Sequence, residues 1–504
     1  VFPQVHHTAR NRMKPKVHVD GVIARIQTLD GVDVGEPMAA PIHAAAARIR
    51  LNTQVMDPEL WSPEFPNLYQ VKVNLTLNGE IISEYVERFG FRSIELRPED
   101  GLYLNGKKIR VRGVNRNVFH PEYGRAVDSE RIWSDARSIK AMNANLVRSH
   151  MPPTLEFMRA SEELGLMVIS ELATWQKPHI DTPIAREIAY NLVATYQNFP
   201  SVIFWANGNE GGFNREIDEV FRLYDLQERP IIHPWSYFEG LDTFHYPSWE
   251  NFTAKLGGPN LYLPTEFLHG LYDGGHGAGL EDYWDAISNS PTGVGGVLWC
   301  WADAAIRRTD RDGELDTYGN QSADSIVGPY GEREASYYTV REVWSPVHVP
   351  LESLTESFDG KLPVENRFYD TSLDACTFEW QLLDVSGPFE TTQSNVVASG
   401  SIAGPDVQPG ESGQLALPLP DNLHESDILQ LNVNSPAGVE LMRWSWPTGK
   451  AQELRGSAEN RLRTKRQGDR FLVTQGQTDW VFSSRTGHLL NSSVGGTDSG
   501  LGKG

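Results

Sequence analysis

The chain has 504 residues, too many for one hydrophobic core, so we expect about three or four domains. Hydrophobic residues make up 39% and charged residues 22%, a composition that is typical of folded globular proteins and excludes a disordered chain. The 45 basic and 66 acidic side chains give a net charge of −21, and because such a surface repels phosphates and anionic lipids, we expect neither nucleic acid nor a membrane as a partner.

The first 95 residues show the pattern of a small β-sandwich. Apolar and polar residues alternate in four short segments, which is typical of strands with one buried face. Asn78-Gly79 separates the last two segments and predicts a tight hairpin turn. The expected strands are 17–19, 47–51, 69–77 and 81–88.

Between residues 96 and 348, strand-like and helix-like segments alternate. The expected strands are 108–114, 145–148, 166–170, 202–206, 231–234, 243–246, 261–265 and 295–301. The expected helices are one that begins at Ser129, followed by 155–164, 184–196, 217–226 and 334–343. Eight strands over about 250 residues predict a (β/α)₈ TIM barrel.

Helical periodicity ends near residue 348. Residues 349–450 show short alternating strands and turn-rich stretches, which predict a second β-sandwich. Alternation restarts in residues 451–504 but stops in a Gly- and Ser-rich end, and about 50 residues of β structure are few for an independent domain. We therefore expect a multidomain α/β plus all-β chain that is cut at its C-terminus, with domains at 1–95, 96–348, 349–450 and 451–504.

Two glutamates follow predicted barrel strands. Reactive groups of barrel enzymes lie at the carboxyl ends of the strands. Glu210 follows the fourth strand and Glu266 the seventh, and these strands lie across the barrel mouth from each other. Two facing carboxylates perform glycoside hydrolysis, in which one with a raised pKa protonates the leaving oxygen and the other attacks the sugar carbon or activates water. The alternative is that both glutamates are solvated loop residues.

The sequence around these glutamates resembles glycoside hydrolase family two, and within it the large β-galactosidases. The motifs that carry the resemblance are Phe89-Gly90-Phe91-Arg92, Arg112-Gly113-Val114-Asn115-Arg116 with His120-Pro121, Asn145 to Arg148 with His150 and Pro152, Asn198-Phe199-Pro200-Ser201-Val202, Gly208-Asn209-Glu210 and Gly295-Gly296-Val297-Leu298-Trp299. The resemblance implies immunoglobulin-like β-sandwiches on both sides of the TIM barrel. It also implies that 451–504 begins a C-terminal β-super-sandwich.

The resemblance assigns roles to individual residues. It implies that Glu210 is the general acid/base and Glu266 the nucleophile, with Arg148 and Arg116 in support. The residues expected to bind the substrate are Asn209 at the sugar 2-hydroxyl, Tyr246 on the nucleophile, His150 at the transition state, His269 on the galactose ring and Trp299 under the sugar. His150 and Trp299 have an alternative reading as packed core residues.

The implied reaction is exo-acting hydrolysis of terminal β-galactosides with retained configuration, through a glycosyl-enzyme intermediate. The partner would be an oligo- or polysaccharide with terminal β-galactose, and a homo-oligomer stays open. The alternatives are hydrolysis of another β-glycoside, namely a modified galactoside, a mannoside or a glucuronide, and an inactive carbohydrate-binding fragment. A glucuronide is disfavoured because residues 318–323 lack the Asn-x-Lys of β-glucuronidases.

Several positions depart from the pattern of the large β-galactosidases. Their magnesium site uses a Glu-x-His after the third strand, whereas Trp175 and Lys177 in this region are not oxygen ligands, so we expect no metal and no cofactor. Asn117 stands where a second sugar-contacting histidine is expected. The run from Arg148 to His150 is one residue short, which predicts that Arg148 does not reach Glu266.

The family's N-terminal sugar-binding jelly roll does not precede residue 1. We therefore expect a chain that is truncated at both ends. Without the native N-terminus, the compartment stays open between cytoplasm and periplasm.

Overall fold

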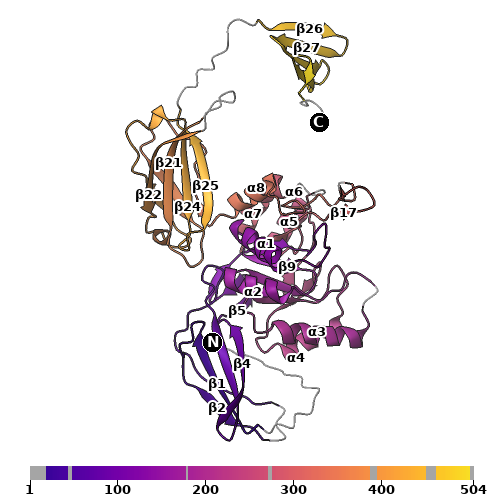
Figure 1. The fold of residues 1–504 in the computed structure, drawn as a ribbon, viewed down its shortest axis with the longest axis vertical. Coiled ribbons are helices and arrows are strands. Elements are labelled where there is room, and N and C mark those ends of the chain that lie inside the picture. Colours follow the sequence, from indigo (N-terminus) through magenta and orange to yellow (C-terminus); the bar gives the residue numbers. More distant parts are fainter. Residues whose placement is uncertain are drawn as a thin grey trace. The chain divides into compact units, whose positions relative to one another are not determined.

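The computed structural model describes residues 19–43, 48–177, 180–270, 275–319, 321–385, 394–449 and 461–499, drawn as coloured ribbon in Figure 1. The chain divides into two compact units, residues 1–448 and residues 449–504. No helix of the described ranges is long and apolar enough to cross a membrane.

An antiparallel sheet in the order β2-β1-β3-β4 forms the start of the chain. Its strands are β1 (Gly21–Thr28), β2 (Met38–Pro41), β3 (Tyr69–Leu77) and β4 (Glu80–Phe89). The hairpin at Asn78-Gly79 is confirmed, and both residues have positive φ, as its turn requires. The expected strand at 47–51 is wrong over its described residues, 48–51, and residues 17–18 lie outside the described ranges. β1 carries the alternation instead, with Val22, Ala24 and Ile26 buried on one face.

A three-stranded sheet connects this domain to the barrel. It consists of β5 (Ile94–Arg97), β6 (Gly101–Leu104) and β7 (Lys107–Ile109). Arg92, just before this sheet, is buried and donates hydrogen bonds to the carbonyl oxygens of Pro200 and Val202, both at 2.7 Å. Hydrogen bonds from Arg92 therefore connect the small domain to the start of the fourth barrel strand.

The centre of the first unit is a curled parallel sheet in the order β12-β11-β10-β9-β8-β16, which confirms the TIM-barrel class. Its strands are β8 (Val111–Asn115), β9 (Leu146–Ser149), β10 (Met167–Glu171), β11 (Val202–Ala206), β12 (Ile231–Ile232) and β16 (Gly295–Leu298). The remaining arc holds β13 (Tyr237–Phe238), β14 (Leu241–Asp242) and β15 (Leu261–Tyr262). The Tyr262 N–H donates to the Thr292 carbonyl oxygen at 2.9 Å, which joins β15 to the start of β16.

The helices of the barrel follow the predicted alternation, with three additions. They are α1 (Ser129–Ala141), α2 (Leu155–Leu164), α3 (Thr182–Tyr196), α4 (Asp218–Tyr224), α5 (Trp249–Leu256), α6 (Gly275–Ala278), α7 (Leu280–Asn289) and α8 (Ala335–Val343). The sequence prediction omitted α5, α6 and α7. In α7, Leu280, Tyr283, Trp284 and Ile287 are buried at helical spacing, a signal that the prediction overlooked.

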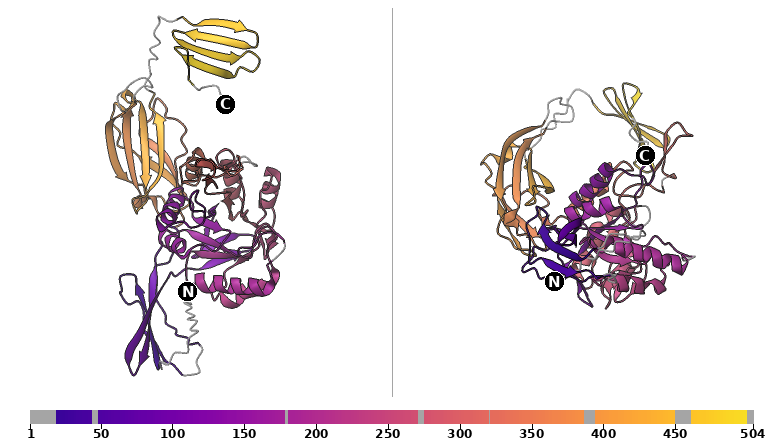
Figure 2. Two further views of the ribbon diagram at one scale, coloured as in Figure 1. Left: turned by 45° about the vertical axis from the view of Figure 1, so that its right-hand side comes forward. Right: turned by 60° about the horizontal axis from the view of Figure 1, so that its bottom comes forward.

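Two further β regions complete the described chain. After the hairpin of β17 (Ile306–Arg308) and β18 (Glu314–Asp316), a sandwich pairs the sheet β19-β20-β23 with the sheet β22-β21-β24-β25. Its strands are β19 (Val347–His348), β20 (Lys361–Asn366), β21 (Thr377–Asp384), β22 (Asn395–Ala403), β23 (Ser412–Ala416), β24 (Ile428–Asn434) and β25 (Glu440–Pro447). The second unit is a single antiparallel sheet, visible in Figure 2, of β26 (Arg463–Gln467), β27 (Arg470–Gln475), β28 (Thr478–Ser483), β29 (Leu489–Val494) and β30 (Thr497–Asp498).

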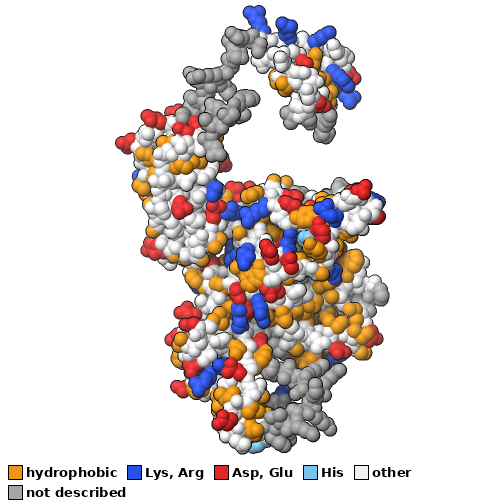
Figure 3. Space-filling model, viewed as in Figure 1, with side chains coloured by type: hydrophobic (Ala, Val, Ile, Leu, Met, Phe, Trp, Pro, Cys, Tyr) orange, Lys and Arg blue, Asp and Glu red, His pale blue; other side chains and the backbone are white. Residues whose placement is uncertain are grey.

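Charged side chains of both signs cover the surface. On the face drawn in Figure 3, acidic and basic groups of residues 1–448 are interspersed. The excess of acidic residues is therefore not gathered into one patch on this face.

Candidate active site

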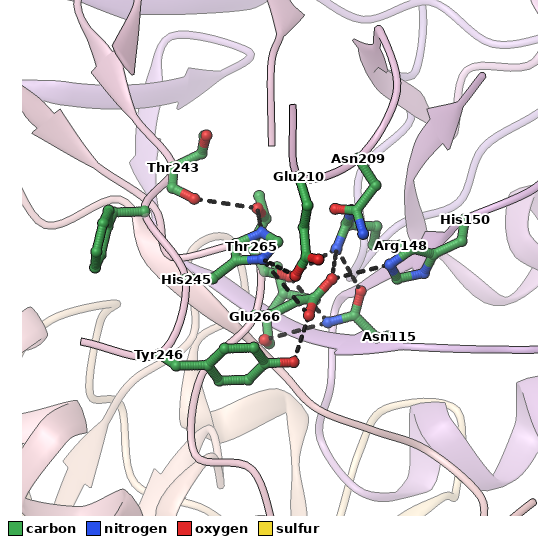
Figure 4. Close-up of polar contacts among 12 residues, drawn as sticks. Asn115, Arg148, His150, Asn209, Glu210, Thr243, His245, Tyr246, Thr265 and Glu266 are labelled. Carbon is green, nitrogen blue, oxygen red and sulfur yellow. Dashed lines mark hydrogen bonds and ion pairs between the residues drawn. The ribbon is translucent and has the colours of Figure 1, made fainter. Parts of the chain in front are cut away.

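The carboxylates of Glu210 and Glu266 converge at the carboxyl ends of the barrel strands, as Figure 4 shows. One oxygen of each lies within 4.8 Å of the other. Glu266 is 2% exposed, while Glu210 is partly exposed. Glu210 adopts a φ of 49°, between Gly208 and Gly211, which also have positive φ, so a tight left-handed turn directs this side chain back over the barrel mouth.

Arg148 reaches Glu266, and the contrary expectation is wrong. Its Nη1 donates to Oε1 of Glu266 at 2.8 Å, and its Nε to Oε2 of Glu171, also at 2.8 Å. The strand register decides the reach of the side chain, because Asn115 of β8 pairs with Arg148 of β9 and both point into the barrel. The shortened segment follows Arg148 and leaves this register unchanged.

Three ring-bearing side chains surround the Glu266 carboxylate. Nε2 of His150 lies 2.9 Å from Oε1, the Tyr246 hydroxyl donates to Oε2, and Nδ1 of His245 lies 3.5 Å from Oε2. Burial raises the pKa of Glu266, but the hydrogen bond from His150 and the nearby His245 and Arg148 outweigh it and hold this pKa far below its usual range. Burial and the Glu266 charge raise the pKa of Tyr246, which therefore stays an O–H donor. Glu266 is an ionised, desolvated carboxylate.

Glu210 has a different set of partners on each oxygen. Oε2 accepts a hydrogen bond from Trp175 Nε1 at 2.8 Å and from Gln176 Nε2 at 3.4 Å, whereas Nδ1 of His245 lies 3.3 Å from Oε1. Burial raises the pKa of Glu210, but the hydrogen bonds from His245 and Trp175 outweigh it, so the pKa lies below its ordinary value. The structure therefore does not show the raised pKa that is expected for the proton donor.

The loop after β10 is bonded to the loop that carries Glu210. Asn209 N–H donates to Thr174 O at 2.8 Å, and Gln176 N–H donates to Asn209 O at 3.1 Å. A Cβ at Gly212 would lie 2.8 Å from the backbone nitrogen of Trp175, so only glycine allows the two loops to approach this closely. The side chain of Asn209 accepts from Arg148 Nη2 at 2.8 Å. These bonds fix the position of Trp175 relative to Glu210.

The predicted ring residues lie in contact around Glu266. His150 meets Trp299 edge-on at 5.2 Å between ring centroids, and His269 lies 6.4 Å from Trp299 in a nearly parallel orientation. His269 also faces Tyr246 at 5.7 Å, and its Nε2 lies 3.0 Å from an oxygen of Asp324. The four predicted residues therefore line one continuous wall.

Arg116 does not join this group. Its Nη2 donates to Asp135 at 2.7 Å on α1, and its guanidinium lies 4.5 Å from the centre of the Phe157 ring on α2. Side chains alternate in and out along a strand. Asn115 points inward and donates to Thr265 O at 2.9 Å, so the next residue points outward to the helices. Asn117 is exposed.

The sequence prediction missed His245, Asn115, Trp175, Gln176 and Asp324. Two of them had a signal, because His245 immediately precedes the predicted Tyr246 and Asn115 directly follows the predicted first barrel strand, 108–114. The others lie on long loops, where neither a strand end nor helical periodicity indicates which way a side chain points.

The residues after β10 do not fit a magnesium ion. Glu171 is fully buried and accepts from Arg148, while Trp175 and Gln176 present N–H groups to Glu210. N–H groups are donors and do not ligate a hard cation, which takes oxygen ligands. The chemistry of this loop is hydrogen-bond donation to a carboxylate.

Two family models match the chain. "Glycosyl hydrolases family 2, TIM barrel domain" matches residues 94–231, and "Glycosyl hydrolases family 2" matches residues 9–92. The matched segments include β8 to β11 and the sequence up to and beyond Glu210.

Solved structures with the same fold include three from Bacteroides species. A glycosyl hydrolase family 2 member from Bacteroides cellulosilyticus is 18% identical, with a TM-score of 0.53 over 93% of this chain and 64% of that one. A β-glucuronidase from Bacteroides uniformis is 15% identical, with a TM-score of 0.54 over 84% and 56%. A β-glycosidase from Bacteroides vulgatus is 15% identical, with a TM-score of 0.55 over 92% and 65%. The chain spans less than two thirds of the length of each structure.

Proposed function

The chain belongs to glycosyl hydrolases family 2, and we propose that it removes terminal β-galactosyl groups with retention of configuration. The observation that carries the proposal is the approach of Glu210 and Glu266 to within 4.8 Å between oxygens. Retaining enzymes hold their carboxyl groups about 5–5.5 Å apart, whereas inverting enzymes need about 6.5–9.5 Å to admit a water. The short separation supports direct attack on the sugar carbon.

In the first step, Glu266 attacks the anomeric carbon while the glycosidic C–O bond breaks and Glu210 gives its proton to the departing oxygen. The low pKa of Glu266 keeps this attacking group ionised. Arg148, His150 and Tyr246 hold its two oxygens in place. Asn209, anchored by Arg148, would accept or donate at the sugar 2-hydroxyl, and the wall of Trp299 and His269 would contact the ring.

In the second step, Glu210 takes a proton from water, which attacks the anomeric carbon and releases Glu266. The first step converts the Glu266 carboxylate into a neutral ester. Its negative charge otherwise raises the pKa of Glu210. Esterification removes this charge and therefore lowers the pKa of Glu210. The lower pKa favours the ionised base that the second step needs.

The pH profile tests the contact between Trp175 and Glu210. The N–H of Trp175 stabilises the ionised form of Glu210, so Trp175→Phe raises the Glu210 pKa. Because the protonated form then persists to higher pH, the alkaline limb of kcat/KM for an unactivated glycoside should move up by roughly one unit. Trp249→Phe is the matched control, since Trp249 contacts Phe252 and Tyr283. An unmoved limb in Trp175→Phe would contradict this contact.

Glu210→Ala tests the acid/base role. Loss of general acid–base catalysis lowers kcat for an alkyl β-galactoside by about 10²–10⁴-fold. A 2,4-dinitrophenyl leaving group needs no proton, so its release in the first step should stay within a few-fold of wild type, and added azide should accelerate the second step. Stopped-flow absorbance separates the two steps. An equal loss of first-step rate for both leaving groups would contradict the assignment.

A glucuronide is the second candidate substrate, since several of the similar solved structures are β-glucuronidases, from Bacteroides uniformis and Ruminococcus gnavus. Two carboxylates beside the ring wall favour a neutral sugar instead. Asp324 lies 3.0 Å from His269, and Asp303 accepts from the Ser325 N–H at 3.0 Å. Burial, together with nearby Glu334 and Asp324, raises the pKa of Asp303 to about 6. A further negative charge at this wall would meet repulsion.

A panel of p-nitrophenyl β-glycosides tests the substrate class. Galactoside, glucuronide and mannoside carry the same leaving group, so the ratios of kcat/KM report the sugar subsite alone. We expect the galactoside to give the highest value. A higher value for the glucuronide would replace galactose by glucuronate in the proposal and leave the two-carboxylate mechanism in place.

A further inference from the structure

We propose that Trp175 and Trp235 form a leaving-group subsite for a flat ring, such as a second pyranose, on the exposed side of Glu210. The inference rests on the proposed function and concerns the part of the substrate that departs. It starts from two tryptophans that remain accessible to solvent although they lie beside the polar cluster around Glu210.

Trp175 touches the proposed acid/base and still exposes most of its ring. Its Nε1 is 2.8 Å from Oε2 of Glu210, yet the residue is 66% exposed. Backbone hydrogen bonds from Gln176 N–H to Asn209 O and from Asn209 N–H to Thr174 O hold this loop against the Glu210 loop. An indole fixed at its nitrogen and open over its face is a preformed apolar platform.

Trp235 lies beside the other oxygen of Glu210. Its ring stacks on His245 at 5.3 Å and 15°, and Nδ1 of His245 lies 3.3 Å from Oε1. The backbone N–H of Glu210 donates to the carbonyl oxygen of Pro234, the residue before Trp235, at 3.3 Å. Trp235 is 40% exposed. Each oxygen of Glu210 thus has one accessible indole in its immediate surroundings.

The reaction geometry brings a leaving group to these rings. The proton of Glu210 passes to the glycosidic oxygen, which must come within hydrogen-bond distance of that carboxyl group. The atoms attached to this oxygen then lie within van der Waals reach of a side chain that is itself hydrogen-bonded to Glu210. A pyranose or aryl ring presents a flat C–H or π face to an indole, whereas a methyl group covers almost none of it.

The subsite is tested by comparing two galactosides with different leaving groups. One is a galactosyl-β-1,4-glucose disaccharide and the other is methyl β-galactoside, and both need the proton of Glu210. Trp175→Ala and Trp235→Ala should each lower kcat/KM for the disaccharide about three- to tenfold more than for the methyl glycoside. Trp175→Phe keeps an aromatic face, so the ratio of the two kcat/KM values should stay near that of wild type. Trp249→Phe serves as the control away from Glu210.

The outcomes separate this inference from the function on which it rests. An equal fall for both substrates in the alanine variants, or a Trp175→Phe ratio that falls as far as that of Trp175→Ala, would overturn the subsite. A shift of the alkaline limb of the pH profile cancels in this ratio, because both substrates are measured at the same pH and both take their proton from Glu210. Failure of the wild-type chain to cleave any β-glycoside would overturn the proposed function and this inference with it.

Discussion

Replacement of Glu266 by alanine is expected to lower kcat for an aryl β-galactoside by roughly 10⁵-fold, the scale seen when a covalent nucleophile is removed. The carboxylate is 2% exposed and accepts from Arg148, His150 and Tyr246. A water that fills the vacated space is neutral and a much weaker nucleophile than the ionised carboxylate. The expected residual rate therefore comes from binding and from Glu210 alone.

A small anion should restore part of the activity of Glu266→Ala. Azide fits a space vacated by a carboxylate, is attracted by the Arg148 guanidinium and attacks from the side where Glu266 stood. Its product should be the glycosyl azide of inverted configuration, which NMR identifies. Glu219→Ala, at an exposed position of α4, is the matched control. A Glu266→Ala rate within tenfold of wild type would show that another group attacks the sugar.

Arg148→Met should cost both stability and turnover. The arginine is fully buried between Glu171 and Glu266, with Nη2 2.8 Å from Glu171 and Nη1 2.8 Å from Glu266. Removal of one partner of a buried ion pair leaves an uncompensated charge and costs about 3–5 kcal/mol. The unfolding midpoint in denaturant should fall accordingly, and kcat should fall because Glu266, the proposed nucleophile, loses its position.

A second substitution separates charge from packing in this cluster. Glu171→Gln removes one of the two buried negative charges, so adding it to Arg148→Met should recover part of the lost free energy of unfolding. Turnover should stay low in the double variant, since Glu266 still lacks its guanidinium partner. Additive losses of stability in the double variant would show that packing, and not charge, governs the effect. Circular dichroism in urea measures the series.

Strand ends could be predicted well from this sequence because their signal is local. Val202–Ala206 is a short apolar run in both the prediction and the structure, and the residue that follows a barrel strand by four positions must lie at its mouth. Glu210 could therefore be located before any coordinates. Family motifs supplied the roles of Tyr246 and His269, which no periodicity indicates, and these roles stay predictions.

The errors arise where direction depends on register or on loop paths. The length of the segment after Arg148 predicts that this side chain falls short of Glu266, but pairing of Arg148 with Asn115 within the sheet sets its reach. Arg116 was assigned to the site from its motif, although strand alternation turns it toward Asp135. Trp175 is brought to Glu210 by backbone bonds between two loops, and such contacts have no counterpart in a single sequence.

Arg92 connects the small N-terminal domain to the barrel strand that leads to Glu210. Its guanidinium holds the carbonyl oxygens of Pro200 and Val202, and β11 runs from there to the turn that aims Glu210. Detaching this domain by proteolysis would remove the buried Arg92 guanidinium. The carbonyl oxygens of Pro200 and Val202 would then lose their hydrogen-bond donor in the interior. Loss of activity should then precede global unfolding, because the strand that positions Glu210, the proposed proton donor, is weakened before the rest of the barrel opens.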